Sequence, residues 1–254
     1  MTEELAFPVP QRVMVVAAHP DDAEFGAGGT VAKWVRQGAE AYFLIATNGD
    51  KGDDEAKTTP EELAAIRARE AKAAADVLGV KELVILPRRD GELIYSIDLR
   101  GDVVRYIRKW KPDVVITHDP RIHISPMGGI NHADHRAIGE ATVDAVYPFS
   151  RGRHQYPEQI AEGLEPHTVW DMFLWGANPP NHWEDVTDYV DCKLEALREH
   201  KSQFSEPERV GQFARERLKR AGEEHGMAFA EAFAHVSLRR GPATPPPGET
   251  PHGA

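Results

Sequence analysis

The feature that most constrains the fold is a short apolar run, Val13–Ala18, that stops at His19, Pro20, Asp21 and Asp22. The run is too short for a helix and rich in β-branched residues, which is typical of a buried strand. Proline cannot extend a central strand because it lacks a backbone N–H. The histidine and both aspartates are therefore predicted to lie on a loop at the carboxyl end of a strand, where open α/β sheets bind their ligands.

Strand-like and helix-like patterns alternate along the rest of the chain. Further strands are predicted at 40–47, 83–86, 114–117 and 169–175, and helices at 30–38, 60–78, 98–110, 132–146, 188–203 and 207–222. The connections are long enough for crossovers between parallel strands. We therefore predict an α/β fold, a Rossmann-like and mostly parallel sheet with helices on both faces.

Three of these helices carry capping signals at their starts. Thr59 with Glu62 three residues later forms a capping box before the helix over 60–78. Thr187 is expected to cap the helix over 188–203, and Ser205 with Glu208 is interpreted as a second capping box.

The segment 241–254 is dominated by proline, glycine and polar residues. It cannot bury apolar surface and is predicted to be a disordered tail. Neither a linker nor an internal repeat precedes it. Residues 1–240 are therefore expected to form a single domain, which a chain of 254 residues is long enough to build.

Composition excludes several classes of function. The chain has 41 acidic and 30 basic residues, and its net charge of −11 argues against a nucleic-acid or anionic-membrane partner. Its one cysteine, Cys192, rules out an internal disulfide and a cysteine-based zinc site. Residues 1–12 carry no signal-peptide pattern, and no apolar stretch approaches the ~20 residues of a membrane span. We therefore expect a cytoplasmic protein.

Two histidines, His132 and His135, follow the strand predicted at 114–117. Side chains three residues apart share a helix face. If the first and fourth strands end at the same sheet edge, this pair can reach His19 and Asp22. Two histidines and a carboxylate, with a position left for water, are the ligand set of a catalytic zinc site.

Each of these residues has an ordinary alternative interpretation. A single histidine at a helix start is more often a solvated or capping residue than a ligand. A single aspartate in a loop more often caps a turn or a helix. His118, Asp119 and His123 also lie near this edge, and each could be a ligand, a partner of a ligand or a polar loop residue.

The glycines at positions 26, 28 and 29 raise a different hypothesis, a dinucleotide-binding loop. That motif needs Gly-x-Gly-x-x-Gly directly after the strand, so that the backbone can approach a pyrophosphate. Here two aspartates intervene and would repel the phosphates. The glycines are more consistent with a tight loop turn and with close packing of a helix on the sheet.

Taken together, the motifs resemble those of the LmbE/PIG-L family of zinc-dependent de-N-acetylases. The resemblance covers about residues 11–238 and depends mainly on His19-Pro20-Asp21-Asp22 and His132-x-Asp134-His135. Weaker matches are Thr47-Asn48-Gly49, Arg67-x-x-Glu70, Leu78-Gly79-Val80, Asp90-Gly91 and Lys193-x-x-Ala196-Leu197-x-x-His200-x-Ser202-Gln203. Ala23 stands where many members have glutamate, which leaves the ligand positions intact.

The resemblance implies that His19, Asp22 and His135 bind Zn²⁺, although Fe²⁺ or another divalent metal could substitute. It implies that Asp21 is the general base. It also implies that His132 is a second acid/base group or the partner of the oxyanion. In that role His132 would be protonated, with its second ring nitrogen held by a neighbouring aspartate, Asp134 or Asp119.

The resemblance further implies that Arg67 and Asp90 contact sugar hydroxyls. Ordinary surface charge is the alternative for both residues. The sugar and the group attached to it are not identified by any motif in the loops 50–59, 119–131 and 147–167.

The implied function is removal of an N-acetyl group from an amino-sugar or amino-sugar conjugate, a small-molecule substrate. Zinc-activated water would attack the amide and acetate would be released. One alternative is a zinc amidase on another N-acyl substrate, such as a thiol conjugate. Another is a non-enzymatic, nucleotide-binding Rossmann-like protein, which would need no stoichiometric metal. A homo-oligomer is compatible with the sequence, but no feature decides the oligomeric state.

Overall fold

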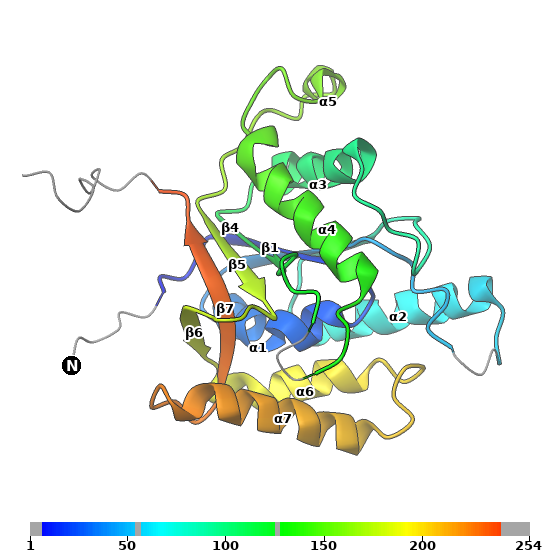
Figure 1. Ribbon diagram of the computed structural model, residues 1–254, viewed down its shortest axis with the longest axis vertical. Helices are drawn as coiled ribbons and strands as arrows, with labels where there is room; N and C mark the ends of the chain where they lie inside the picture. The colour runs from blue at the N-terminus through cyan, green and yellow to red at the C-terminus, as the bar shows by residue number, and fades with distance from the viewer. Residues whose placement is uncertain (1–6, 54–56, 125–127, 240–254) are drawn as a thin grey trace, which may run out of the picture.

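Seven strands form one sheet in the part of the chain that the computed structural model describes, residues 7–53, 57–124 and 128–239. Their order across the sheet is β3-β2-β1-β4-β5-β7-β6 (Figure 1). The strands are β1 (Arg12–Ala17), β2 (Glu40–Ile45), β3 (Glu82–Ile85), β4 (Val114–His118), β5 (Asp171–Trp175), β6 (His182–Asp185) and β7 (Ala230–Ser237). β1 to β5 pair in parallel, whereas β7 runs antiparallel to β5 and β6. The predicted mostly parallel α/β sheet is confirmed.

The sequence pattern does not predict β6 and β7. β7 carries three alternating alanines, Ala230, Ala232 and Ala234, and alanine is depleted in strands. The strand forms because it pairs along β5, more than fifty residues earlier in the chain, and buries Phe233. Tertiary pairing thus outweighs local propensity at this edge of the sheet.

Helices cover both faces of the sheet (Figure 1). α3 and α4 pack on one face, α1 and α2 on the other, with α6 beside α1 and α2, and α7 beside α6 and β7. The helices are α1 (Asp22–Arg36), α2 (Pro60–Leu78), α3 (Ile97–Trp110), α4 (Ala133–Asp144), α5 (Pro157–Ala161), α6 (Val190–Arg198) and α7 (Pro207–Glu223), with a π-helical turn η1 (Ala145–Phe149) and a 3₁₀ turn η2 (Thr187–Tyr189). Within the described ranges, none of them is long and apolar enough to cross a membrane.

Successive residues of β1 point to opposite faces, as the pleat of a strand requires. Met14 and Val16 join the core cluster under α3 and α4, whereas Val13 and Val15 join the cluster under α1 and α2. All four side chains are fully buried. A continuous apolar run is therefore needed here, because both faces of this central strand are covered.

Helix α1 begins at Asp22, eight residues earlier than predicted, so the three glycines lie inside the helix and not in a loop. A Cβ on Gly26 would lie 2.5 Å from the indole of Trp175, and one on Gly28 would lie 3.2 Å from the side chain of Lys193. The glycines therefore permit close packing, one of the two roles expected, while the expected loop turn is wrong.

The start of α2 is confirmed in detail. The Thr59 hydroxyl accepts a hydrogen bond from the Glu62 backbone N–H at 3.2 Å, and the Glu62 carboxylate accepts one from the Thr59 N–H at 3.0 Å. The helix ends at Gly79, whose φ of +75° places it in the left-handed region that favours glycine.

The other two predicted caps are wrong. Thr187 lies in η2, and α6 begins only at Val190. The Thr187 hydroxyl instead accepts a hydrogen bond from the Phe229 N–H, so it joins this region to the start of β7. Glu206 occupies the N-cap position of α7 without a side-chain cap, which leaves no capping box for Ser205. The predicted tail, 241–254, lies outside the described residues.

Candidate functional site

The candidate residues meet at the carboxyl ends of β1 and β4, where the connections to the next strands run toward opposite edges of the sheet. β1 lies between β2 and β4, and the chain proceeds from β1 to β2 on one side and from β4 to β5 on the other. Such a switch point opens a crevice at the carboxyl ends of the strands. His19 follows β1, His118 ends β4, and α4 begins after His132. Residues more than one hundred positions apart are thereby brought together.

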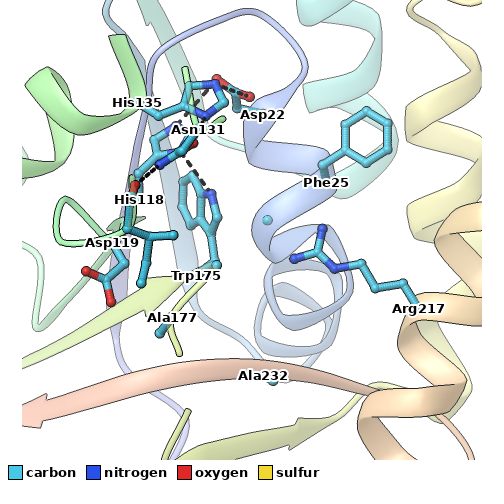
Figure 2. Close-up of a pocket in the computed structure, with 13 residues that line it drawn as sticks. Asp22, Phe25, His118, Asp119, Asn131, His135, Trp175, Ala177, Arg217 and Ala232 are labelled. Carbon is cyan, nitrogen blue, oxygen red and sulfur yellow. Dashed lines mark hydrogen bonds and ion pairs between the residues drawn. The ribbon is translucent and has the colours of Figure 1, made fainter. Parts of the chain in front are cut away.

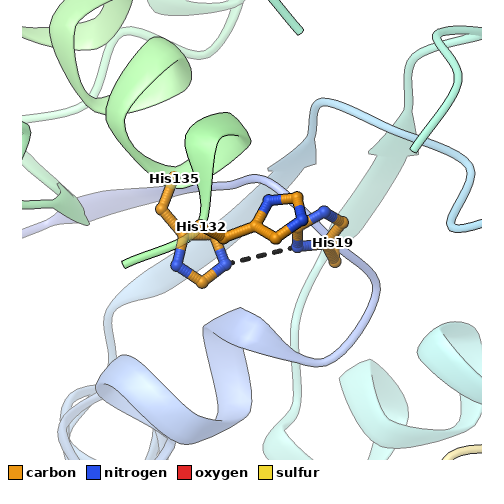
Figure 3. A group of neighbouring side chains, drawn as sticks. All are labelled: His19, His132 and His135. Atoms are coloured by element: carbon orange, nitrogen blue, oxygen red, sulfur yellow. Dashed lines mark hydrogen bonds between the residues drawn. The ribbon is translucent and has the colours of Figure 1, made fainter. Parts of the chain in front are cut away.

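Three predicted metal ligands come within contact distance of one another. His19 Nδ1 lies 3.2 Å from an Asp22 carboxylate oxygen, and His135 Nε2 lies 3.2 Å from the other oxygen. The two histidine nitrogens are 3.3 Å apart, the contact drawn in Figure 3. Ligands at 2.0–2.1 Å from a tetrahedral metal lie about 3.3 Å from each other. His135 belongs to two groups of side chains that could hold one metal ion, one with His19 and His132 and one with Asp22 and His118.

The charges around His19 also fit a cation. His19 Nε2 lies 3.1 Å from an Asp90 oxygen and 3.4 Å from an Asp134 oxygen. Burial opposes the charged imidazolium, but contacts with Asp134, Asp22 and Asp90 outweigh it and raise the pKa of His19 to about 12. The carboxylates that stabilise a proton on this ring stabilise a divalent cation at the same place.

Asp22 is held in its ionised form. Burial raises the pKa of its carboxyl, but His135 and His118 outweigh burial and hold that pKa well below its usual value. One carboxylate oxygen also accepts a hydrogen bond from the His19 backbone N–H at 2.8 Å. A fixed, ionised carboxylate is the form that a metal requires of this ligand.

Asp21 precedes the proposed ligand Asp22, but its carboxylate hydrogen bonds to a different residue. Its Oδ1 accepts a hydrogen bond from Arg67 Nη2 at 3.2 Å. Burial raises the pKa of Asp21, and the charge of Arg67 opposes that shift. A carboxylate with a raised pKa that is held at one oxygen has the properties of a general base.

Arg67 and Asp90 are both buried, so the interpretation as surface charge is wrong. Besides Asp21, Arg67 donates to the carbonyl of Gly49 at 3.2 Å, and its Nη1 lies 3.7 Å from an Asp90 oxygen. These contacts make Arg67 a positioning residue for Asp21. A contact of either residue with sugar hydroxyls stays a prediction.

His132 is placed beside the ligands by its position at the start of α4. Its ring centroid lies 4.7 Å from that of His19. Its Nδ1 accepts a hydrogen bond from the Asp134 backbone N–H at 3.2 Å, which caps the helix. A nitrogen that accepts cannot carry a proton, so the ring proton is on Nε2.

This hydrogen bond corrects the expected state of His132. Burial, and then the charge of His19, lowers the pKa of His132, so the neutral ring is favoured over the expected imidazolium. Neither expected aspartate holds its second nitrogen through a carboxylate. The Asp134 carboxylate accepts from the Gly91 N–H at 2.7 Å, and that of Asp119 pairs with Arg121 at 2.6 Å.

The three residues left open by the sequence have different environments. His118 is buried at the site: its Nδ1 accepts a hydrogen bond from Trp175 Nε1 at 3.1 Å, and its Nε2 lies 3.4 Å from Asp22. The Ala18 backbone N–H also donates to Nε2 at 3.2 Å, and His118 belongs with Asp22 and His135 to a group that could hold a metal ion. Asp119 adjoins it, whereas His123 is exposed on the loop. No sequence signal marks Trp175, because its contact with His118 joins two different strands.

A cavity of about 330 Å³ opens beside the ligands (Figure 2). Asp22 and His135 lie at one end, Trp175 and Asp119 form one wall, and Arg217 extends toward it from α7. The sequence analysis does not single out Arg217, because it lies in a charged helix without a motif.

Comparisons with known proteins agree with this geometry. A family model described as GlcNAc-PI de-N-acetylase (PIG-L) matches residues 14–146. The diacetylchitobiose deacetylase of Thermococcus kodakarensis is 35% identical over 196 residues, which cover 77% of this chain and 71% of that protein. A probable N-acetyl-alpha-D-glucosaminyl L-malate deacetylase 2 of Bacillus anthracis is 29% identical over 202 residues, which cover 77% and 82%.

This chain is similar to one solved structure over most of the length of both proteins. It is the N,N'-diacetylchitobiose deacetylase from Pyrococcus horikoshii, complexed with its inhibitor. The TM-score is 0.83 at 33% sequence identity, and the match covers 90% of this chain and 84% of that one. All three of these similar proteins are named as deacetylases of N-acetylated sugars or sugar conjugates.

Proposed function

The chain belongs to the PIG-L family of de-N-acetylases, and from that premise we propose that it removes the N-acetyl group of an N-acetylglucosamine-containing conjugate and releases acetate. The observation that carries the proposal is the set of distances among His19, Asp22 and His135. The two histidine nitrogens lie 3.3 Å apart, and each lies 3.2 Å from a different oxygen of Asp22, which places three possible ligands around one point.

His19, Asp22 and His135 are the residues that would hold the metal. When bound, the metal polarises the amide carbonyl and lowers the pKa of a water from ~15.7 to ~7. We favour Zn²⁺ because two nitrogens and one carboxylate oxygen with an open position are typical of catalytic zinc. The same three donors also suit Fe²⁺, so metal analysis must decide between them.

Asp21 is proposed to move the proton. Its free oxygen accepts a proton from the attacking water as the water oxygen bonds to the amide carbon. The carbon–nitrogen bond then breaks as Asp21 returns this proton to the nitrogen, which leaves as an amine. Arg67 holds the other oxygen of Asp21 throughout, so the base needs no reorientation between the two transfers.

His132 is proposed as a neutral hydrogen-bond donor to the carbonyl oxygen. Its Nε2 carries the ring proton because Nδ1 is occupied by the Asp134 N–H. The carbonyl oxygen gains negative charge as the water adds, so this hydrogen bond strengthens in the transition state. A preorganised donor of this kind contributes about 3–4 kcal/mol.

Metal content and acetate release test the proposal together. The purified protein should contain about one equivalent of metal and release acetate from at least one member of a panel. The panel contains N,N'-diacetylchitobiose, N-acetyl-α-D-glucosaminyl L-malate and N-acetylglucosamine 1-phosphate. A chelator should abolish turnover, and adding back Zn²⁺ or Fe²⁺ should identify the metal.

A protein without stoichiometric metal that binds a nucleotide would favour the alternative of a non-enzymatic Rossmann-like protein. A metalloprotein that cleaves other N-acyl compounds and none of the panel would favour the broader amidase. The cytoplasmic location, the absence of nucleic-acid and membrane partners and a homo-oligomeric assembly stay predictions. The contacts of Arg67 and Asp90 with the sugar also stay predictions.

A further inference from the structure

The side chain of Arg217 is a cation that borders the cavity beside the proposed metal ligands. Arg217, on α7, borders both this cavity and a smaller adjoining one lined by Phe25 and Phe213. Figure 2 shows its side chain extending toward the cavity from the side opposite Trp175. Its guanidinium makes no hydrogen bond or ion pair with any residue in the described ranges.

The neighbouring carboxylates are already paired. Glu231 accepts hydrogen bonds from Lys193 Nζ at 2.6 Å and from the backbone N–H groups of Gly29 and Thr30. Asp119 on the opposite wall is paired with Arg121 through two hydrogen bonds of 2.9 and 2.6 Å. Neither carboxylate is therefore free to neutralise Arg217.

Arg217 differs from two other arginines of its helix, which have ionic partners. Arg209 lies 3.5 Å from Glu206, and Arg215 lies 2.5 Å from Asp191. Arg217 is exposed at the edge of the cavity and has no such pair among the described residues. A guanidinium at a cavity wall can bind an anion through charge-assisted hydrogen bonds when no carboxylate of the protein already occupies it.

We propose that this cavity holds the group attached to the amino sugar and that Arg217 binds a carboxylate or phosphate on that group. The preferred substrates are then anionic N-acetylglucosaminides. The inference rests on the proposed function, because it requires the acetamide to lie at the end formed by Asp22 and His135. The volume of about 330 Å³ is within the range of small-ligand pockets.

The position of Arg217 suits this role better than a role in the reaction itself. It comes from α7, whereas the ligands and the proposed base come from segments after β1 and β4. It therefore acts as a specificity-determining residue. A planar guanidinium can donate two parallel hydrogen bonds to either a carboxylate or a phosphate, so the two sources must be separated by experiment.

The experiment measures kcat/KM for three substrates in the metal-loaded enzyme and its variants. N,N'-diacetylchitobiose is the neutral substrate, the malate conjugate supplies carboxylates, and N-acetylglucosamine 1-phosphate supplies a phosphate. Arg217→Gln should lower the ratio of anionic to neutral kcat/KM by about 10- to 100-fold, mainly through KM, because a hydrogen bond to a charged group is lost. Arg217→Lys should retain part of the ratio.

Arg220→Gln is the matched control. Both arginines are exposed on the same helix, but Arg220 does not line this cavity, so removing its charge should leave the ratio unchanged. If the larger loss falls on the malate conjugate, the group bound is a carboxylate; if it falls on the 1-phosphate, the group is a phosphate.

Failure of the inference and failure of the proposed function give different results. Acetate release with an unchanged ratio in Arg217→Gln overturns the inference and leaves the function standing. No acetate from any of the three substrates overturns the function. Calorimetry with the deacetylated products, glucosaminyl malate and glucosamine 1-phosphate, then tests Arg217 without turnover. Equal affinity of wild type and Arg217→Gln for both products contradicts the inference by itself.

Discussion

Two walls of the cavity differ in how the chain satisfies their polar groups. On the wall after β1 and β4, the side chains of His19, Asp22 and Asp21 are buried or half-buried, and each contacts partners from distant segments. On the α7 wall, Arg217 faces the cavity without a partner among the described residues. The first wall is preorganised for one chemistry, which is how active sites stabilise transition states. The second wall can accept the charge of a ligand.

The largest effect is expected from removing a ligand on the first wall. His19→Ala should abolish metal binding and lower turnover by at least about 10⁴-fold, beyond the range for losing a general base. Metal analysis and acetate release measure the two losses. His123→Ala is the control, because His123 is an exposed histidine on the nearby loop. If the His19 variant binds one equivalent of metal as tightly as wild type, the ligand assignment is wrong.

A smaller loss is expected from the proposed base. Asp21→Asn should keep the metal and lower kcat by about 10²- to 10⁴-fold, because the amide cannot accept the proton of water. Asp22→Asn should lose the metal instead. Metal analysis of both variants decides between the roles, and metal loss in Asp21→Asn with retention in Asp22→Asn would reverse them.

The C-terminal region also supports the first wall through a buried ion pair. Glu231 on β7 joins Lys193 on α6 to the backbone of α1, the helix that carries Asp22. Lys193→Met leaves a buried carboxylate unpaired and should cost about 3–5 kcal/mol of stability. Chemical denaturation measures the loss. Arg215→Met, which breaks an exposed pair, should cost less than about 1 kcal/mol; equal losses in the two variants would deny Lys193 this role.

The effect of Arg67 on the pKa of Asp21 can be tested through the pH dependence of turnover. Its charge favours ionised Asp21, so Arg67→Met should raise the pKa of that carboxyl. The base is active only when ionised. As the pH falls, the variant should therefore lose turnover at a higher pH than the wild type does. The pH profile of kcat measures this displacement, with the exposed Arg69→Met as control. A changed KM with an unmoved acid limb would favour the sugar contact instead.

Gly26→Ala is expected to have the smallest effect. A Cβ at this position would lie 2.5 Å from Trp175, which hydrogen bonds to His118 beside the proposed metal ligands. Overpacking of this kind costs about 1–3 kcal/mol. Thermal unfolding measures the cost, and unchanged stability would show that the indole can move without strain. Gly211→Ala in α7, where a Cβ meets nothing within 4 Å, is the control.

The sequence by itself determined the local features of this protein. The β-branched run of β1 and the capping box at Thr59 depend on neighbours within a few residues, and both predictions are confirmed. The family resemblance, which depended mainly on the motifs at His19 and His132, is also confirmed. These signals can be read from sequence because strand pattern, capping and metal-ligand spacing are short-range properties.

Only the tertiary structure decided the features that join distant segments. β7 is a strand because it pairs with β5, although its alanines favour no strand. The Asp134 N–H donates to Nδ1 of His132, and Arg217 is placed at the cavity by the packing of α7 on α6 and β7. Hydrogen-bond direction, burial and the pairing of charges depend on which surfaces meet. No local sequence pattern specifies which surfaces come into contact, because the folded core brings together residues far apart in the chain.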